Sequence, residues 1–117
     1  MVGIDFSHMP CIYWGNVTKA SYLQRRILVH SILYYEMASS VITDDQFNAI
    51  GHQLVELRNT MDEESYSKTT YYYVFNDFDA STGFYLYGRL NKQDREYLEL
   101  IAQHVLRRYN ESRKAGK

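Results

Sequence analysis

The chain has 117 residues, of which 45% are apolar and 15% aromatic, so it can bury the core of one domain over residues 1–117. Thirteen basic and fourteen acidic residues give a net charge of −1. The chain therefore has no net positive charge that would attract nucleic acid over long distances. One cysteine, Cys11, excludes an internal disulfide, and no apolar run approaches the ~18 residues of a membrane span. The start lacks a secretory signal pattern, so we expect a cytoplasmic protein that does not enter a membrane.

The first part of the chain combines an irregular segment with one long amphipathic helix. Residues 1–17 show no helical or strand period but hold apolar residues such as Trp14, so we expect them to wrap onto the core. Thr18 can cap a helix that runs to about Met37. One face, expected to be buried, carries Leu23, Ile27, His30, Tyr34 and Met37. We expect His30 to be a core residue whose polar atoms are hydrogen-bonded. The opposite face, expected to be exposed, carries Ser21, Gln24 and Arg25.

A second amphipathic helix follows after a short turn at residues 38–42. Thr43 and Gln46 form the pattern of a capping box, and Asp44 and Asp45 place negative charge in the first turn, where the helix dipole favours it. The expected buried stripe is Phe47, Ile50, Leu54, Leu57 and Met61. Because the connection is short, the two helices should pack as an antiparallel hairpin.

The remainder of the chain predicts one extended element and a last helix. Residues 69–75 are β-branched and aromatic, which favours a strand, and residues 76–83 have the composition of a loop. Asn91, with Asp94 three residues later, caps a helix that ends in a polar tail over residues 110–117. Its inward residues are Leu98, Ile101, Ala102, Val105 and Tyr109. The predicted fold is mainly α, or small α+β, with a helical hairpin, a C-terminal helix and a minor strand or hairpin element.

The hairpin carries a recognisable pattern. Tyr34 and Tyr35 are followed by about eight residues of turn and then by Asp44, with Phe47 and Asn48 three and four positions later. Residues 22–60 thereby resemble the small N-terminal (Ia-type) domain of NAD-dependent DNA ligases, which binds nicotinamide mononucleotide (NMN). That family has Tyr and Asp where this chain has Phe47 and Asn48. The chain contains no Lys-x-Asp-Gly, so ligase catalysis is excluded.

The resemblance implies a nucleotide groove formed by Tyr34, Tyr35, Asp44, Phe47 and Asn48. Its affinity for NMN or NAD should be weak, because Phe47 lacks a hydroxyl and Asn48 lacks a charge. The resemblance also implies a truncated, stand-alone relative of phage or mobile-element origin. An alternative stays open, in which Tyr34 and Phe47 pack in the core and Asp44 serves only as a helix-start charge.

Other chemistry-bearing residues predict no catalytic or metal site. Asp77 and Asp79 are superficially similar to the loop of haloacid-dehalogenase-type phosphotransferases, but the chain has no room for their sheet. A calcium loop starting at Asp77 would need Gly and Glu where Thr82 and Gly88 stand, so we expect turn-capping aspartates. His8 and Cys11 lack a third ligand at metal spacing, and His52 and His104 fall on or beside exposed faces. We therefore expect no enzyme, and no cofactor beyond weakly bound NMN or NAD.

Twelve tyrosines are a surplus for so small a core. Strand alternation would divide them between two faces and leave an exposed patch, drawn from Tyr71, Tyr72, Tyr73, Tyr85 and Tyr87. A tyrosine-rich core is the alternative. The leading interpretation is a small binding or regulatory protein that contacts a protein partner or a second copy, for example to inhibit a host or defence factor. The alternatives are a nucleotide-binding module with weak NMN or NAD affinity and, less favoured, a nucleic-acid partner that uses arginine clusters.

Overall fold

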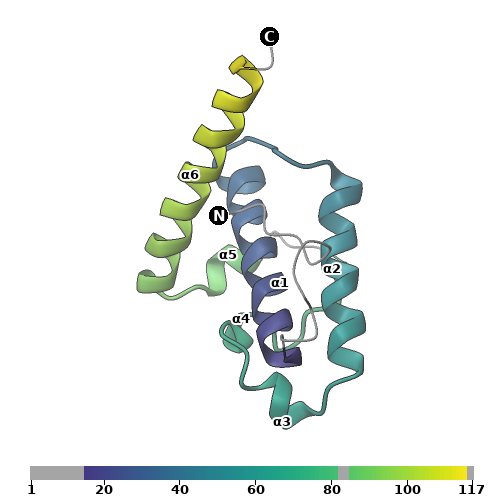
Figure 1. Cartoon of the computed structure of the whole chain (residues 1–117). Helices are drawn as coiled ribbons and strands as arrows, with labels where there is room; N and C mark the ends of the chain where they lie inside the picture. The colour runs from purple at the N-terminus through teal and green to yellow at the C-terminus, as the bar shows by residue number, and fades with distance from the viewer. Residues whose placement is uncertain (1–14, 82–84, 116–117) are drawn as a thin grey trace.

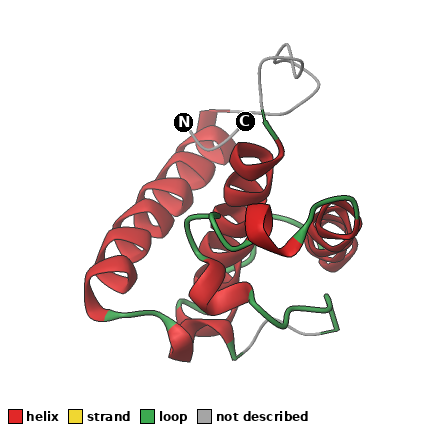
Figure 2. Cartoon of the chain, turned by 90° about the horizontal axis from the view of Figure 1, so that it is seen from below, coloured by secondary structure: helices red, strands yellow, loops and turns green. Residues whose placement is uncertain are grey.

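The computed structural model describes residues 15–81 and 85–115, and within them it is built from helices joined by loops (Figures 1 and 2). The elements are α1 (Asn16–Ser31), η3 (Ile32–Glu36), α2 (Asp44–Asn59), α3 (Glu63–Tyr66), α4 (Tyr72–Phe75), α5 (Leu86–Arg89) and α6 (Lys92–Ala115). The mainly α prediction is confirmed. No helix in the described ranges is both long and apolar enough to cross a membrane.

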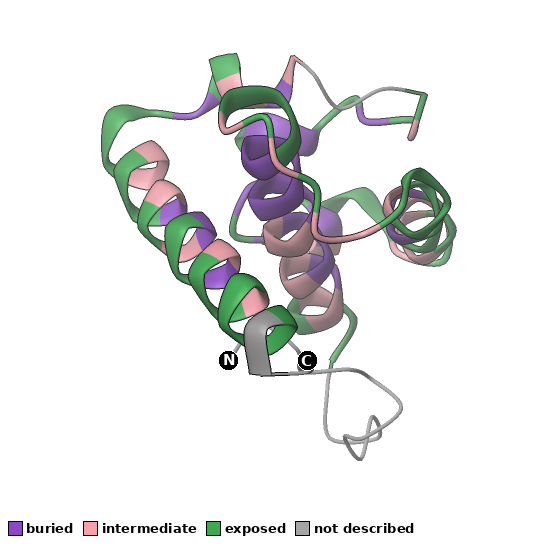
Figure 3. Cartoon of the chain, turned by 90° about the horizontal axis from the view of Figure 1, so that it is seen from above, coloured by how far each residue is buried: buried purple, intermediate pink, exposed green. Residues whose placement is uncertain are grey.

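Helix α1 is the centre of the molecule, with α2 on one side and α6 on the other (Figure 1). Because it is covered from both sides, its last turns are buried around most of their circumference, as Figure 3 shows. Gln24 was expected on an exposed face, but its side chain is fully buried, so that prediction is wrong. The helix begins at Asn16 after the N-cap Gly15, so Thr18 lies inside the helix and does not cap it.

The α1 and α2 helices form the predicted antiparallel hairpin (Figure 1). The capping box is present: the Gln46 N–H donates to Thr43 Oγ1 at 3.0 Å, and the Thr43 N–H donates to Gln46 Oε1 at 2.8 Å. Of the predicted stripe on α2, Ile50 and Leu54 are buried, and the partly buried members packed against the core are Phe47, Leu57 and Met61.

The strand predicted over residues 69–75 is wrong, because this segment is a tight turn followed by the one-turn helix α4. A strand needs a neighbour for its backbone groups, and the described residues contain no other strand. Gln24 supplies the bonds instead: its Nε2 donates to Thr69 Oγ1 at 2.9 Å, and its Oε1 accepts from the Tyr71 N–H at 3.0 Å. The helical turn then places Val74 and Phe75 in the core.

Helix α6 begins where the sequence predicts, since Asn91 Oδ1 accepts the Asp94 N–H at 2.7 Å. Leu98, Ala102 and Val105 are buried, whereas Ile101 and Tyr109 are half-buried. The helix continues to Ala115, beyond the end that the sequence predicts before Asn110, because Arg, Glu and Lys are good helix formers. Residues 110–113 of the expected polar tail are exposed. The segment expected to wrap onto the core lies outside the described residues over 1–14, and residues 16 and 17 belong to α1.

Candidate functional site

A wide helical turn at the end of α1 presents two tyrosines at the surface. In η3 the Met37 N–H donates to the Ile32 carbonyl at 3.0 Å, a bond that spans five residues instead of four. The extra residue in the turn breaks the 3.6-residue period, so Tyr34 leaves the buried stripe on which the sequence placed it. Tyr34 is 50% exposed and Tyr35 is 43% exposed. The prediction that Tyr34 faces the core is therefore wrong.

The chain then reverses direction within a few residues. Ala38 adopts a positive φ of 50°, and the Ser39 N–H returns to the Leu33 carbonyl at 2.8 Å, which ends the helix. Beyond it, the Ser40 hydroxyl donates to the Ile42 carbonyl at 2.6 Å. These bonds hold the connection to α2 beside the tyrosines.

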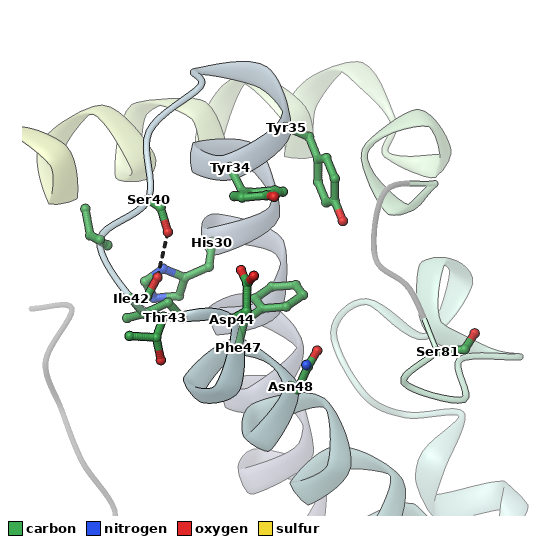
Figure 4. Close-up of a pocket in the computed structure, with 11 residues that line it drawn as sticks. His30, Tyr34, Tyr35, Ser40, Ile42, Thr43, Asp44, Phe47, Asn48 and Ser81 are labelled. Atoms are coloured by element: carbon green, nitrogen blue, oxygen red, sulfur yellow. Dashed lines mark hydrogen bonds between the residues drawn. The ribbon is translucent and has the colours of Figure 1, made fainter.

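A pocket with a cavity volume of about 240 Å³ lies between η3 and the beginning of α2 (Figure 4). Its lining comes from the end of α1, from η3, from the connecting loop, from the first turns of α2 and from one distant loop. The lining residues are His30, Tyr34, Tyr35, Ser40, Val41, Ile42, Thr43, Asp44, Phe47, Asn48 and Ser81.

The start of α2 supplies the polar and aromatic groups that face the tyrosines. The Thr43 capping box fixes where the helix begins, and Asp44, Phe47 and Asn48 then follow within the first two turns. In Figure 4 the Asp44 side chain points toward the Tyr34 ring, with the Phe47 ring beside it. Asp44 and Asn48 are exposed, whereas Phe47 is half-buried against the core. The pocket thus combines aromatic walls with a carboxylate and an amide.

Ser81 reaches the pocket because Gly51 has no side chain. A Cβ at Gly51 would lie 3.3 Å from Cβ of Ala80 and 3.5 Å from Cζ of Phe78, so the glycine permits this loop to approach α2 closely. Asp79 holds the loop by accepting the Ser81 N–H at 2.9 Å. The turn-capping role predicted for the two aspartates is present at Asp79 only, because Asp77 instead pairs with Arg89 at 2.6 Å, and this bond lowers the pKa of Asp77. Across the described residues, no group of three or more potential metal ligands is formed.

His30 lies in the wall of the pocket and is only 5% exposed. Burial, and secondarily the nearby positive charge of Arg26, lowers the pKa of His30 to about 4, so the ring is neutral at pH 7. Its Nδ1 has no hydrogen-bond partner among the described residues, which corrects the expectation of a satisfied core histidine. A buried polar atom without a partner costs free energy, so the burial of this nitrogen lowers the stability of the fold.

All five residues that the sequence selects for nucleotide binding line this one pocket: Tyr34, Tyr35, Asp44, Phe47 and Asn48. The sequence missed His30, the loop residues and Ser81. Thr43 had been identified only as a cap, and His30 only as a member of the apolar stripe. Ser81 gave no signal, because its place depends on the contact between Gly51 and Ala80, residues far apart in the sequence.

The tyrosines predicted to form an interface do not share one exposed face. Tyr71 is buried, and burial raises its pKa to about 12. The hydroxyl of Tyr72 donates to Glu63 at 2.8 Å, that of Tyr73 to Asp94 at 2.6 Å and that of Tyr87 to Glu99 at 2.6 Å. The guanidinium of Arg89 covers the Tyr85 ring at 4.5 Å. Within this group only Tyr73, at 40% exposure, is exposed, whereas Tyr72, Tyr85 and Tyr87 are half-buried.

Comparisons of the chain with protein-family models, with curated proteins and with solved structures found no match. What the chain does is therefore inferred from the residues of the pocket.

Proposed function

We propose that this protein is a non-catalytic binding protein whose pocket holds NMN or the corresponding half of NAD. One observation carries the proposal. The residues that the similarity to the ligase domain selects, separated by up to fourteen positions in the sequence, all line a single cavity. They are Tyr34, Tyr35, Asp44, Phe47 and Asn48.

The groups around the cavity suit the parts of this ligand. A tyrosine ring face attracts the positive pyridinium ring, and the Asp44 carboxylate can accept hydrogen bonds from ribose hydroxyls. The Asn48 amide offers both a donor and an acceptor to the ligand's carboxamide. The cavity of about 240 Å³ is smaller than the ~300–1,000 Å³ typical of drug-sized ligands, which favours one mononucleotide half over a whole dinucleotide.

A protein interface built from the other tyrosines has less support. Tyr71 is buried, and three of the remaining hydroxyls are bonded within the chain. Such residues offer little free polar surface to a partner. By contrast, Tyr34 and Tyr35 are exposed and meet in a cavity, so the proposal rests on the pocket.

Calorimetric titration of the full chain with NMN tests the proposal. We expect a dissociation constant between about 1 μM and 1 mM, which corresponds to about 4–8 kcal/mol of binding free energy. The affinity should be modest because Phe47 and Asn48 lack groups that the ligase pattern has. Tyr34→Ala should weaken binding by about 1–3 kcal/mol, the usual loss when an aromatic stacking partner is removed.

Tyr97→Ala is the matched control, because Tyr97 is 52% exposed, like Tyr34, but lies on α6 away from the pocket lining. It should leave the affinity unchanged. An absence of binding at millimolar NMN, or equal losses in the two variants, would refute the proposed function.

A further inference from the structure

Helix α6 lies at the edge of the molecule and is packed on one face only. That face meets α1 and η3, and Leu98, Ala102 and Val105 are buried there (Figures 1 and 3). The opposite face, which we call the outer face of α6, is exposed to solvent. Its residues are Glu96, Tyr97, Leu100, His104, Arg107 and Arg108.

The outer face presents two large apolar side chains to water. Leu100 is 65% exposed, more than any other large apolar or aromatic side chain of the described residues, and Tyr97 is 52% exposed. Because they are three positions apart on one helix, these two side chains are neighbours. A second surface that covered them would remove apolar area from water, which favours association.

Charge is divided between the two ends of the outer face. Glu96 precedes the apolar pair, whereas Arg107 and Arg108 follow Leu100 by about two turns. None of these three charged groups takes part in an ion pair formed by the described residues. One end of the face is therefore negative and the other positive. Two copies of such a face match in charge when their helices run in opposite directions.

We propose that the outer face of α6 joins two copies of this chain through an antiparallel pair of α6 helices. Ala102 lies midway between Glu96 and Arg108, about 9 Å along the helix from each. A two-fold axis at the level of Ala102 therefore places the acidic end of each helix beside the basic end of the other. It also brings the two Leu100 side chains within about 6 Å of each other along the helix direction.

The two edges of the outer face match separately in this arrangement. Eleven residues make almost three helical turns, so Glu96 shares one edge with Arg107, and Tyr97 shares the other edge with Arg108. The two-fold axis keeps each edge against its own copy. Glu96 of one chain then faces Arg107 of the second copy, and the Tyr97 ring faces Arg108, which suits a cation–π contact. Each pair forms twice, so the chain itself supplies the complementary surface.

Sedimentation equilibrium of the full chain tests for the dimer. We expect a weak monomer–dimer equilibrium that shifts toward monomer as salt is added, because two apolar side chains per copy are few for a standard interface and the charge pairs are exposed. Leu100→Ser should weaken the dimer on the order of tenfold, as for a central interface residue, with unchanged thermal unfolding of the monomer. A monomer at every concentration up to about 1 mM, or a dimer that Leu100→Ser leaves intact, would overturn the proposal.

Charge reversal tests the antiparallel direction. Glu96→Arg alone and Arg107→Glu alone should each weaken the dimer, because like charges then face each other, and the two changes in one chain should restore it. Glu56→Arg, at an exposed position of α2, is the matched control and should leave the equilibrium unchanged. In a parallel pair equal charges already face each other, so single reversals without effect, or a double variant that fails to recover, would refute the antiparallel arrangement.

This inference is independent of the proposed function. The outer face of α6 contributes no residue to the lining of the pocket. NMN binding by a strictly monomeric chain would overturn the dimer alone, and a dimer that binds no NMN would overturn the proposed function alone.

Discussion

At the scale of single residues, His30 shows that a side chain buried in the core can also line a cavity. It lies on the apolar stripe that the sequence defines, and it is buried as the pattern requires. Periodicity reports only which face of the helix points inward, so it does not reveal that a pocket opens beside the ring. That Nδ1 has no hydrogen-bond partner follows from the folded surroundings of the ring and cannot be read from the sequence.

The lowered pKa of His30 predicts acid sensitivity of the fold. Its folded value is about 4 against 6.5 ordinarily, so between these values the unfolded chain binds a proton that the folded chain does not. The contribution of His30 to the free energy of unfolding is therefore fully present above pH 6.5 and decreases as the pH is lowered toward 4. We expect a loss of about 3 kcal/mol over that window, which urea denaturation at pH 7 and pH 4 would measure.

His30→Gln should remove this part of the pH dependence, whatever its effect at pH 7. The same substitution at His52, an exposed position of α2, controls for the chemical change. Aspartates whose pKa is lowered in the fold, such as Asp77, contribute only as the pH falls below their ordinary value of 3.8. Identical slopes for wild type and His30→Gln would show that His30 is not the source.

At the scale of elements, the sequence predicts a helix start where a side-chain cap forms, as at Thr43 and Asn91, but not the start of α1, which follows Gly15 without a side-chain cap. The caps at Thr43 and Asn91 depend on side chains that bond a backbone N–H three residues away, so the sequence contains the whole interaction. The wide turn η3 and the helix α4 depend on tertiary contacts instead. Five residues of the candidate site were predictable because they belong to one hairpin with a local pattern, unlike Ser81.

Thr43 links the stability of α2 to the shape of the pocket. Thr43→Ala removes the acceptor for the Gln46 N–H, and we expect a loss of about 1 kcal/mol in the free energy of unfolding. Because the cap also fixes the first turn that carries Asp44, NMN binding should weaken in the same variant. Thr18→Ala is the control, since Thr18 is exposed inside α1 and caps nothing; it should be neutral or slightly stabilising. Chemical denaturation of both variants measures the free energy of unfolding. Equal losses of this free energy in Thr43→Ala and Thr18→Ala would contradict the capping role of Thr43.

At the scale of the whole molecule, one buried amide joins the central helix to the segment that the sequence misassigned. Gln24 of α1 bonds Thr69 and the backbone of Tyr71, although 45 and 47 positions separate it from them. Thr69 in turn donates to the Tyr66 carbonyl at 2.8 Å, which ties in the end of α3. No pattern along the sequence reports such a network, because it exists only once the segments have met. This explains why aromatic and β-branched residues form turns and a short helix here.

Gln24→Met tests whether this network holds the segment in place. Methionine keeps the approximate volume of glutamine but leaves the buried Tyr71 N–H without its acceptor, so we expect a loss of about 1–3 kcal/mol in the free energy of unfolding. Hydrogen exchange should locate the effect, with faster exchange at Tyr71 and through α4 and little change in α2. Gln53→Met, at an exposed position of α2, controls for the chemical change and should be nearly neutral. If Gln24→Met is equally harmless, packing of Val74 and Phe75 alone suffices to fold residues 69–75, and the amide is dispensable.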